Sequence, residues 1–202
     1  INLILSSIFG ALSLYAAASC ANELSPQIFS LSNMTVGVTT FDEIQNTFGM
    51  VEPSRINQEI ESDITLCYIN STTKSKSFLT FESGAMGGFK YITGFRISYL
   101  PQKGNCVSTK IDIASLSTGN GVRLGQSLED FKKTVKVKFK KYGPDLTYET
   151  VKQRRATREE LKKIRDIWPN EKQDYFDVTI LINAKFYDNK LIDFYVHKIE
   201  SY

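Results

Sequence analysis

The chain has 202 residues, of which 42% are hydrophobic and 23% charged, and its formal net charge at pH 7 is +3. This composition supports a hydrophobic core and argues against intrinsic disorder, and so small a net charge gives no reason to expect a nucleic-acid partner. The charge is uneven, because residues 121–170 carry 14 Lys and Arg against 7 Asp and Glu. Such a segment could attract an acidic partner or lipid head groups, although alternating Lys and Glu favour an ordinary solvated face.

Residues 1–20 read INLILSSIFGALSLYAAASC and contain no charged side chain. A hydrophobic run followed by small residues is typical of a secretory signal peptide and predicts an exported protein. A membrane-spanning helix is the alternative, but the small residues and the cysteine fit processing better. Ala17-Ala18-Ser19 before Cys20 is similar to a bacterial lipoprotein cleavage box, which would make Cys20 the lipidated N-terminus; cleavage after Ala18 is the rival. We therefore expect a periplasmic protein, or one anchored to a bacterial envelope membrane through Cys20.

Cys67 and Cys106 are the two remaining cysteines. An even pair in an oxidising compartment predicts a disulfide. The closed loop of about forty residues would contribute on the order of 3–4 kcal/mol in the chain-entropy model. A zinc site is not expected from two cysteines and a single histidine, and no motif indicates any other metal or cofactor.

Two segments of the chain begin alike, with TFDEIQNTFG at 40–49 and SLEDFKKTVK at 127–136. Thr40 and Ser127 are hydroxyl residues of the kind that cap helices, and an acidic residue follows each three positions later, as in a capping box. Apolar residues behind each cap recur at i, i+3 and i+7, the spacing of a helix that faces a core. Each segment therefore predicts an amphipathic helix.

Glycines followed by proline predict the ends of both helices. The first helix should end at Gly49, and the second at Gly143, because glycine readily adopts the left-handed C-cap conformation. The second helix is then expected over 127–142, about two turns longer than the first. Residues 135–139 also alternate like a strand, but the Gly-Pro stop favours helix.

Strand patterns follow each helix: DITLCYIN, SFLTFES and ITGFRISYL after the first, and DYFDVTILINAKFYDNKLIDFYVHKI after the second. Asp188-Asn189 predicts a tight hairpin turn. An extra helix is expected at 157–168, with Thr157 and Glu160 as its capping box and an apolar stripe. The stripe consists of Leu161, Ile164 and Trp168.

These elements predict an α+β fold built from two tandem units, each a helix followed by antiparallel strands. The first unit covers 28–105 and the second 106–202, and the helices of both should pack on one face of a shared sheet. The evidence for duplication is the repeated order of cap, helix and strands, together with the similar apolar patterns of ITGFRI and LIDFYV.

A short extended lead, a glycine, a capped helix and an aromatic-Gly ending occur at 36–49 and again at 122–143. This order resembles the small outer-membrane assembly lipoproteins of the SmpA/OmlA (BamE) type, and in tandem it is similar to the β-lactamase-inhibitory protein. The resemblance covers about 30 of the 202 residues. It implies two units that share one sheet, and it identifies no residue at a partner interface.

Motifs of catalysis are absent from the sequence. His197 is the single histidine, and on a predicted strand it is an ordinary packing or surface residue. Neither G-x-S-x-G nor H-E-x-x-H occurs, and the glycine-rich stretches at 84–88 and 119–125 lack the lysine and hydroxyl residue of a P-loop. We therefore expect a protein that is not an enzyme.

Two functions fit these observations. The first is a protein-binding module of the cell envelope, such as an inhibitor, an immunity-type protein or an assembly accessory protein. The alternative is a binder of small ligands or anionic lipids that uses the basic segment 132–165.

Alternation along the predicted strands separates an apolar face, expected under the helices, from a mixed face expected to meet solvent. The apolar set is Leu79, Phe81, Phe95, Ile97, Val178, Ile180, Ile182, Ile192, Phe194 and Val196. The mixed set is Thr80, Glu82, Arg96, Ser98, Thr179, Leu181, Asn183, Lys185, Tyr187, Asp193, Tyr195 and His197. Tyr and Arg are enriched among interface hot spots, so we expect partner contacts at Arg96, Tyr187, Tyr195 and His197. An ordinary half-solvated sheet face is the alternative.

Overall fold

The structure is a computed structural model, and it describes residues 24–55, 63–70, 76–85, 88–102 and 104–202. The predicted signal peptide and the predicted lipidation site Cys20 lie outside the described residues. Within the described part, the fold is α+β, with three α-helices and one nine-stranded, mainly antiparallel sheet.

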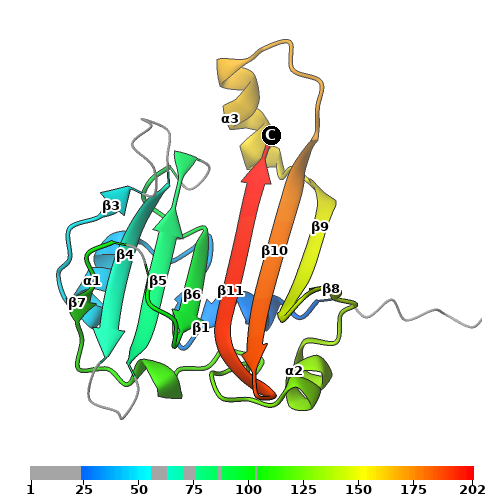
Figure 1. The fold of residues 1–202 in the computed structure, drawn as a ribbon. Helices are drawn as coiled ribbons and strands as arrows, with labels where there is room; N and C mark the ends of the chain where they lie inside the picture. Colours follow the sequence, from blue (N-terminus) through cyan, green and yellow to red (C-terminus); the bar gives the residue numbers. More distant parts are fainter. Residues whose placement is uncertain (1–23, 56–62, 71–75, 86–87, 103) are drawn as a thin grey trace, which may run out of the picture.

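The large sheet joins strands from both halves of the chain (Figure 1). In spatial order its strands are β3 (Ser54–Arg55), β4 (Ile64–Asn70), β5 (Ser77–Ser83), β6 (Gly94–Ser98), β11 (Lys190–Ser201), β10 (Tyr175–Tyr187), β9 (Asp145–Arg155) and β8 (Lys140–Tyr142). The ninth strand, β7 (Val107–Ser108), pairs in parallel with β4. The two halves meet where β6 pairs antiparallel with β11.

Smaller elements lie around this sheet. They are the 3-10 helices η1 (Pro26–Phe29) and η3 (Ile113–Ser115) and a two-stranded sheet of β1 (Ser30–Leu31) and β2 (Met34–Thr35).

Helices α1 (Phe41–Phe48) and α2 (Leu128–Val135) pack on the same face of the large sheet, here called the inner face. The ring of Phe48 lies 5.7 Å from that of Phe81 on β5, and the ring of Phe131 lies 6.0 Å from that of Phe194 on β11. These rings belong to one continuous core cluster. The prediction that helices from both halves share one sheet face is confirmed.

The predicted helix starts are confirmed. Thr40 and Thr157 each form a complete capping box with a glutamate three residues on, and the side chain of Ser127 accepts the backbone N–H of Asp130. Helix α3 (Arg158–Ile167) is the extra helix of the second half. Its predicted apolar stripe is partly wrong, because Ile164 is buried whereas Trp168 is 57% exposed.

The predicted end of the second helix is wrong, because α2 ends at Val135 and Lys136 forms its C-cap in the left-handed conformation. Residues 136–139 form neither helix nor strand, but burial alternates along them, so Val137 and Phe139 pack against the core. The Phe139 ring lies 5.3 Å from that of Phe131. The Gly-Pro pair that suggested a helix stop instead lies between Tyr142 and Asp145, where it turns the β8–β9 hairpin.

The apolar set predicted for the inner face is buried, with one exception. Lys185 pairs with Asp193 whereas Phe186 pairs with Leu191, so Ile192 is the extra residue of a β-bulge. The bulge makes Leu191 the buried residue and leaves Ile192 half-buried, which corrects the prediction for Ile192.

The predicted hairpin at Asp188-Asn189 is confirmed by positive φ angles at both residues, 47° and 58°. Two successive positive φ angles are the geometry of the tight turns that match the twist of the flanking strands. This turn sets the register of β10 against β11.

The predicted disulfide between Cys67 and Cys106 is also confirmed, with the two Cα atoms 4.4 Å apart. The neighbours of Cys67 on β4, Leu66 and Tyr68, point into the core, so Cys67 faces the opposite side of the sheet, here called the outer face. The bond therefore fastens the connection from β6 to β7 across the outer face. We call its described residues, 99–102 and 104–106, the strap.

Replacing both Cys67 and Cys106 with serine should lower the free energy of unfolding by about 3–4 kcal/mol, because the unfolded chain regains the freedom of a loop that the disulfide closes. Urea unfolding followed by circular dichroism measures this change. The parent in reducing agent is the control and should lose a similar amount. An unchanged unfolding midpoint in both samples would contradict the prediction.

Candidate functional site

The outer face carries an open groove between the strap and the β8–β9 hairpin. It consists of two adjoining hollows of about 510 and about 240 Å³, and Arg96, Lys185 and Asp193 line both. Leu100, Pro101, Gln102 and Gly104 of the strap form one wall, and Tyr142, Asp145 and Thr147 lie at the other end. We call this feature the outer groove.

Four charged side chains of alternating sign form a row along the outer groove. Asp145 on β9 pairs in register with Lys185 on β10, which pairs with Asp193 on β11, next to Arg96 on β6. Adjacent strands are spaced by roughly 4.8 Å, so this row spans about 14 Å. Lys185 Nζ lies 3.5 Å from Asp145 Oδ1, and Arg96 Nε lies 3.6 Å from Asp193 Oδ1.

Three polar atoms in this row are buried and have no hydrogen-bond partner within the described protein: Arg96 Nε, Asp193 Oδ1 and Asp145 Oδ1. The ion-pair distances of 3.5 and 3.6 Å exceed the usual range of hydrogen bonds between nitrogen and oxygen. Buried polar atoms are normally hydrogen-bonded because leaving them without a partner is unfavourable. These atoms face their ion-pair partners, while the remaining side-chain atoms of Arg96, Asp193, Lys185 and Asp145 stay partly exposed, so the row presents charges of both signs to the groove.

Aromatic side chains lie beside this row. The Tyr195 hydroxyl donates a hydrogen bond of 2.7 Å to Glu82, and the Arg96 guanidinium lies 5.1 Å from the centre of the Tyr195 ring. The His197 imidazole stacks on the same ring at 6.0 Å. Burial, with the nearby Glu82 carboxylate, raises the pKa of Tyr195 above its usual range, so Tyr195 remains a hydrogen-bond donor.

The structure brings together three of the four residues predicted to contact a partner. Arg96 and Tyr195 are directly paired across β6 and β11, and His197 stacks on Tyr195. Tyr187 lies apart from them at the β10–β11 turn, where it is 75% exposed and outside the residues that line the groove.

The prediction that the whole mixed face meets solvent is wrong on the central strands β5, β6 and β11. Thr80, Ser98 and Asp193 are buried, and Thr80 lines the hollow that the strap borders. Sequence reasoning also missed Asp145 and Gln102, because alternation on one strand does not reveal what crosses it. Gln102 accepts a hydrogen bond of 3.4 Å from Arg96.

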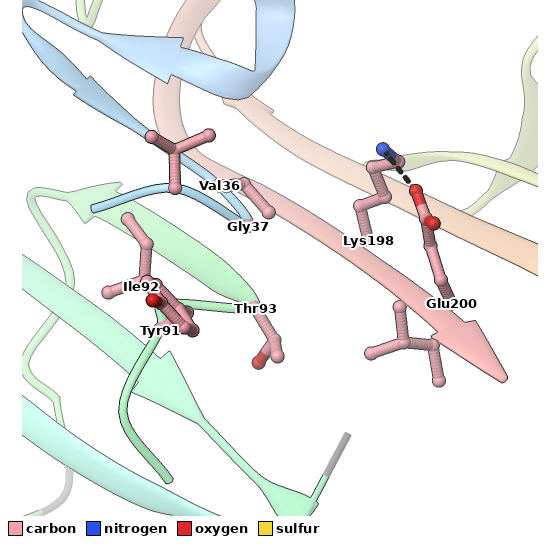
Figure 2. Close-up of a pocket in the computed structure, with 9 residues that line it drawn as sticks. Val36, Gly37, Tyr91, Ile92, Thr93, Lys198 and Glu200 are labelled. Atoms are coloured by element: carbon pink, nitrogen blue, oxygen red, sulfur yellow. Dashed lines mark ion pairs between the residues drawn. The ribbon is translucent and has the colours of Figure 1, made fainter. Parts of the chain in front are cut away.

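A separate hollow of about 320 Å³ opens where β11 extends past β6 (Figure 2). Val36, Tyr91 and Ile92 form its apolar side, and Lys198 and Glu200 lie across from them. Lys198 Nζ is 2.8 Å from Glu200 Oε1, and Glu200 also accepts from Arg154. Because these charges pair with each other and with Arg154, this hollow is the weaker candidate.

No cluster of three His, Cys, Asp or Glu side chains that could hold a metal occurs among the described residues. In the same part of the chain, no helix is long and apolar enough to cross a membrane. Searches of protein-family models, curated proteins and solved structures find no match to this chain. The resemblance to the SmpA/OmlA type and to the β-lactamase-inhibitory protein stays a prediction.

Replacing Tyr195 with phenylalanine should lower the free energy of unfolding by about 1–3 kcal/mol, because Glu82 loses the hydroxyl that donates to it in a half-buried site. Tyr187→Phe is the matched control, since its exposed hydroxyl makes no comparable contact, and it should leave stability unchanged. Urea unfolding measures both variants. Equal stability of the two would show that the Tyr195–Glu82 bond contributes nothing.

Proposed function

We propose that this protein is a non-catalytic protein-binding module of a bacterial cell envelope, and that the outer groove holds its partner. The observation that carries the proposal is the row of alternating charges along the outer groove, whose Arg96, Asp193, Lys185 and Asp145 side chains remain partly exposed. A surface of a folded partner can supply both donors and acceptors along such a row. Inhibitors, immunity-type proteins and assembly accessory proteins all belong to this class.

The chemistry of the groove favours a protein partner. Arginine and tyrosine are enriched at interface hot spots, because each combines a large contact area with a polar group. Arg96 lines both hollows of the groove and lies against the ring of Tyr195, and the flanking carboxylates prevent a field of one sign. Charges of both signs select a complementary surface and disfavour wrong partners.

The groove is also held rigid before any partner arrives. Its floor consists of paired strands, and the disulfide between Cys67 and Cys106 fastens the end of the strap to β4. A preformed site loses less conformational entropy on binding than a mobile one. Rigid sheets with fixed side chains suit recognition of a folded surface.

The disulfide also supports export, because such bonds persist mainly in oxidising compartments. The apolar leader at 1–20 and the lipoprotein-like Cys20 add to this argument from the sequence. We place the protein in the periplasm, or on an envelope membrane through a lipidated Cys20.

We further propose that the chain consists of two copies of one unit, as the sequence predicted. Matching backbone contacts support this proposal. Gly37 donates to the Ile92 carbonyl at 2.8 Å, and Gly125 donates to the Leu191 carbonyl at 2.8 Å. The helix caps repeat the match, since Thr40 forms an isolated bridge with Tyr91 and Ser127 forms one with Lys190.

This correspondence gives the outer groove a position in the proposed repeat. If Ile92 corresponds to Leu191, then Arg96 corresponds to Tyr195, because each stands four residues further on. Arg96 and Tyr195 pair directly in the antiparallel β6–β11 ladder. A local two-fold axis between the proposed copies would therefore pass between these two residues, at the edge of the groove.

A small polar ligand is the second candidate, because the larger hollow of about 510 Å³ has the size of a small-molecule site. Such a ligand would not use the basic residues of segment 132–165, whereas the alternative derived from the sequence expected it to. Of the basic segment 132–165, the residues lining the groove are Tyr142, Asp145 and Thr147, none of which is basic.

The test is capture of the partner from envelope extract with a variant that fills the groove. Asn183 lines the groove, and Asn183→Arg should abolish retention of the protein that the parent captures in a stoichiometric amount. Asn46→Arg is the matched control, since it makes the same exchange at an exposed position of α1 on the inner face, and it should retain the partner.

Both variants should keep the melting temperature of the parent. If Asn183→Arg and Asn46→Arg retain the captured protein equally well, the outer groove is not the binding surface. Loss of a captured small molecule instead of a protein would support the second candidate.

A further inference from the structure

Helix α3 stands at one end of the long β9–β10–β11 ribbon, beside the C-terminus (Figure 1). Its last residue, Ile167, is 67% exposed, and its C-cap, Trp168, is 57% exposed. Single exposed apolar residues are ordinary, but an isoleucine and a tryptophan side by side at the C-terminal end of α3 form a larger apolar surface.

Basic side chains lie along the same helix. Arg158, Lys162, Lys163 and Arg165 of α3 are all exposed. The exposed acids of the helix are Glu159 and Asp166, so the exposed side chains of α3 carry a net charge of about +2 at neutral pH. The α3 tip, residues 158–168, is thus both apolar and positively charged.

The fold separates the basic segment of the sequence into two parts. The lysines of α2 and β8 lie at the start of β9, and those of α3 follow its end. β9 has 11 residues, and a strand rises about 3.3 Å per residue, so the two basic groups are roughly 30 Å apart or more. The exposed tryptophan belongs to the α3 group alone, because Trp168 is the single tryptophan of the chain.

The α3 tip is held firmly against the sheet. Arg154 on β9 donates to both carboxylate oxygens of Glu160, at 3.0 and 3.1 Å, and Ile164 is buried. The hydrogen bonds from Arg154, with that from the Thr157 backbone, lower the pKa of Glu160 to about 2, so this contact stays charged at neutral pH. The exposed apolar residues therefore belong to an anchored helix.

We propose that the α3 tip docks on an anionic bilayer surface, with Ile167 and Trp168 in the interfacial region and the basic side chains of α3 at the lipid head groups. Tryptophan favours the membrane–water interface because its ring is apolar while its N–H can remain hydrated. Lysine and arginine near an anionic membrane are attracted to its negative surface potential. Docking of this kind goes beyond the partner proposed for the outer groove, and it fixes how the molecule sits on the membrane.

The test uses the fluorescence of Trp168, which reports on the tip alone. The described core begins at Leu24, so a chain that starts at Ala21 keeps this core and removes the apolar leader. Vesicles of phosphatidylglycerol and phosphatidylcholine in equal parts should shift Trp168 emission to the blue, as its ring leaves water. Vesicles of phosphatidylcholine alone should not.

Charge variants locate the docking surface. Lys162→Gln with Lys163→Gln should weaken partitioning to the anionic vesicles on the order of tenfold, because each basic residue adds to the attraction. Lys140→Gln with Lys141→Gln is the matched control, with the same loss of charge on β8, and it should bind like the parent. Co-sedimentation with vesicles should also show weaker binding for Ile167→Ser, at an unchanged melting temperature.

Three results would overturn the proposal. They are an absent blue shift on anionic vesicles, an equal shift on neutral vesicles, and equal partitioning of the two double variants. The last result would mean that overall charge, or the β8 end, determines binding instead of the α3 tip.

Discussion

The pairing of β6 with β11 is the contact on which the rest of the structure depends. Residues 94–98 pair with residues 193–197 and join the strands of both halves into one sheet. The strands approach so closely at Gly94 that an added Cβ would lie 2.7 Å from the Val196 carbonyl oxygen. Only glycine fits at this point without moving the backbone.

The pairing of β6 with β11, here called the seam, brings different residues together on the two faces of the sheet. On the inner face, Phe95 and Phe194 lie 6.4 Å apart and continue one core from α1 to α2. On the outer face, the seam sets Arg96 beside Tyr195 and Asp193, so residues distant in sequence form one polar groove. The disulfide then fastens the strap to β4 beside this groove.

Local signals in the sequence predicted local structure well. The caps at Thr40, Ser127 and Thr157, the turn at Asp188-Asn189 and the Cys67–Cys106 pair each depend on chemistry within a few residues or on the redox compartment. Alternation likewise identified the buried strand residues. It failed at Ile192, because a bulge reverses the pattern without a mark in the sequence.

The outer groove could be predicted only in part. Arg96, Tyr195 and His197 came from alternation, but their partners depend on strand order and on the path of the strap, which are long-range properties. The end of α2 failed for another reason, since Gly143-Pro144 suits a helix stop and a hairpin turn equally well. Packing of Phe139 against Phe131 decides between the two.

Site-specific photo-cross-linking in cells that express the chain natively tests the central claim most directly. A benzophenone side chain placed at Asn183 points the reagent into the outer groove, and one at Asn46 labels the opposite face of the sheet. We predict a single cross-linked protein adduct from position 183 and none from position 46. An adduct from position 46 alone, or from neither position, would contradict a partner in the outer groove.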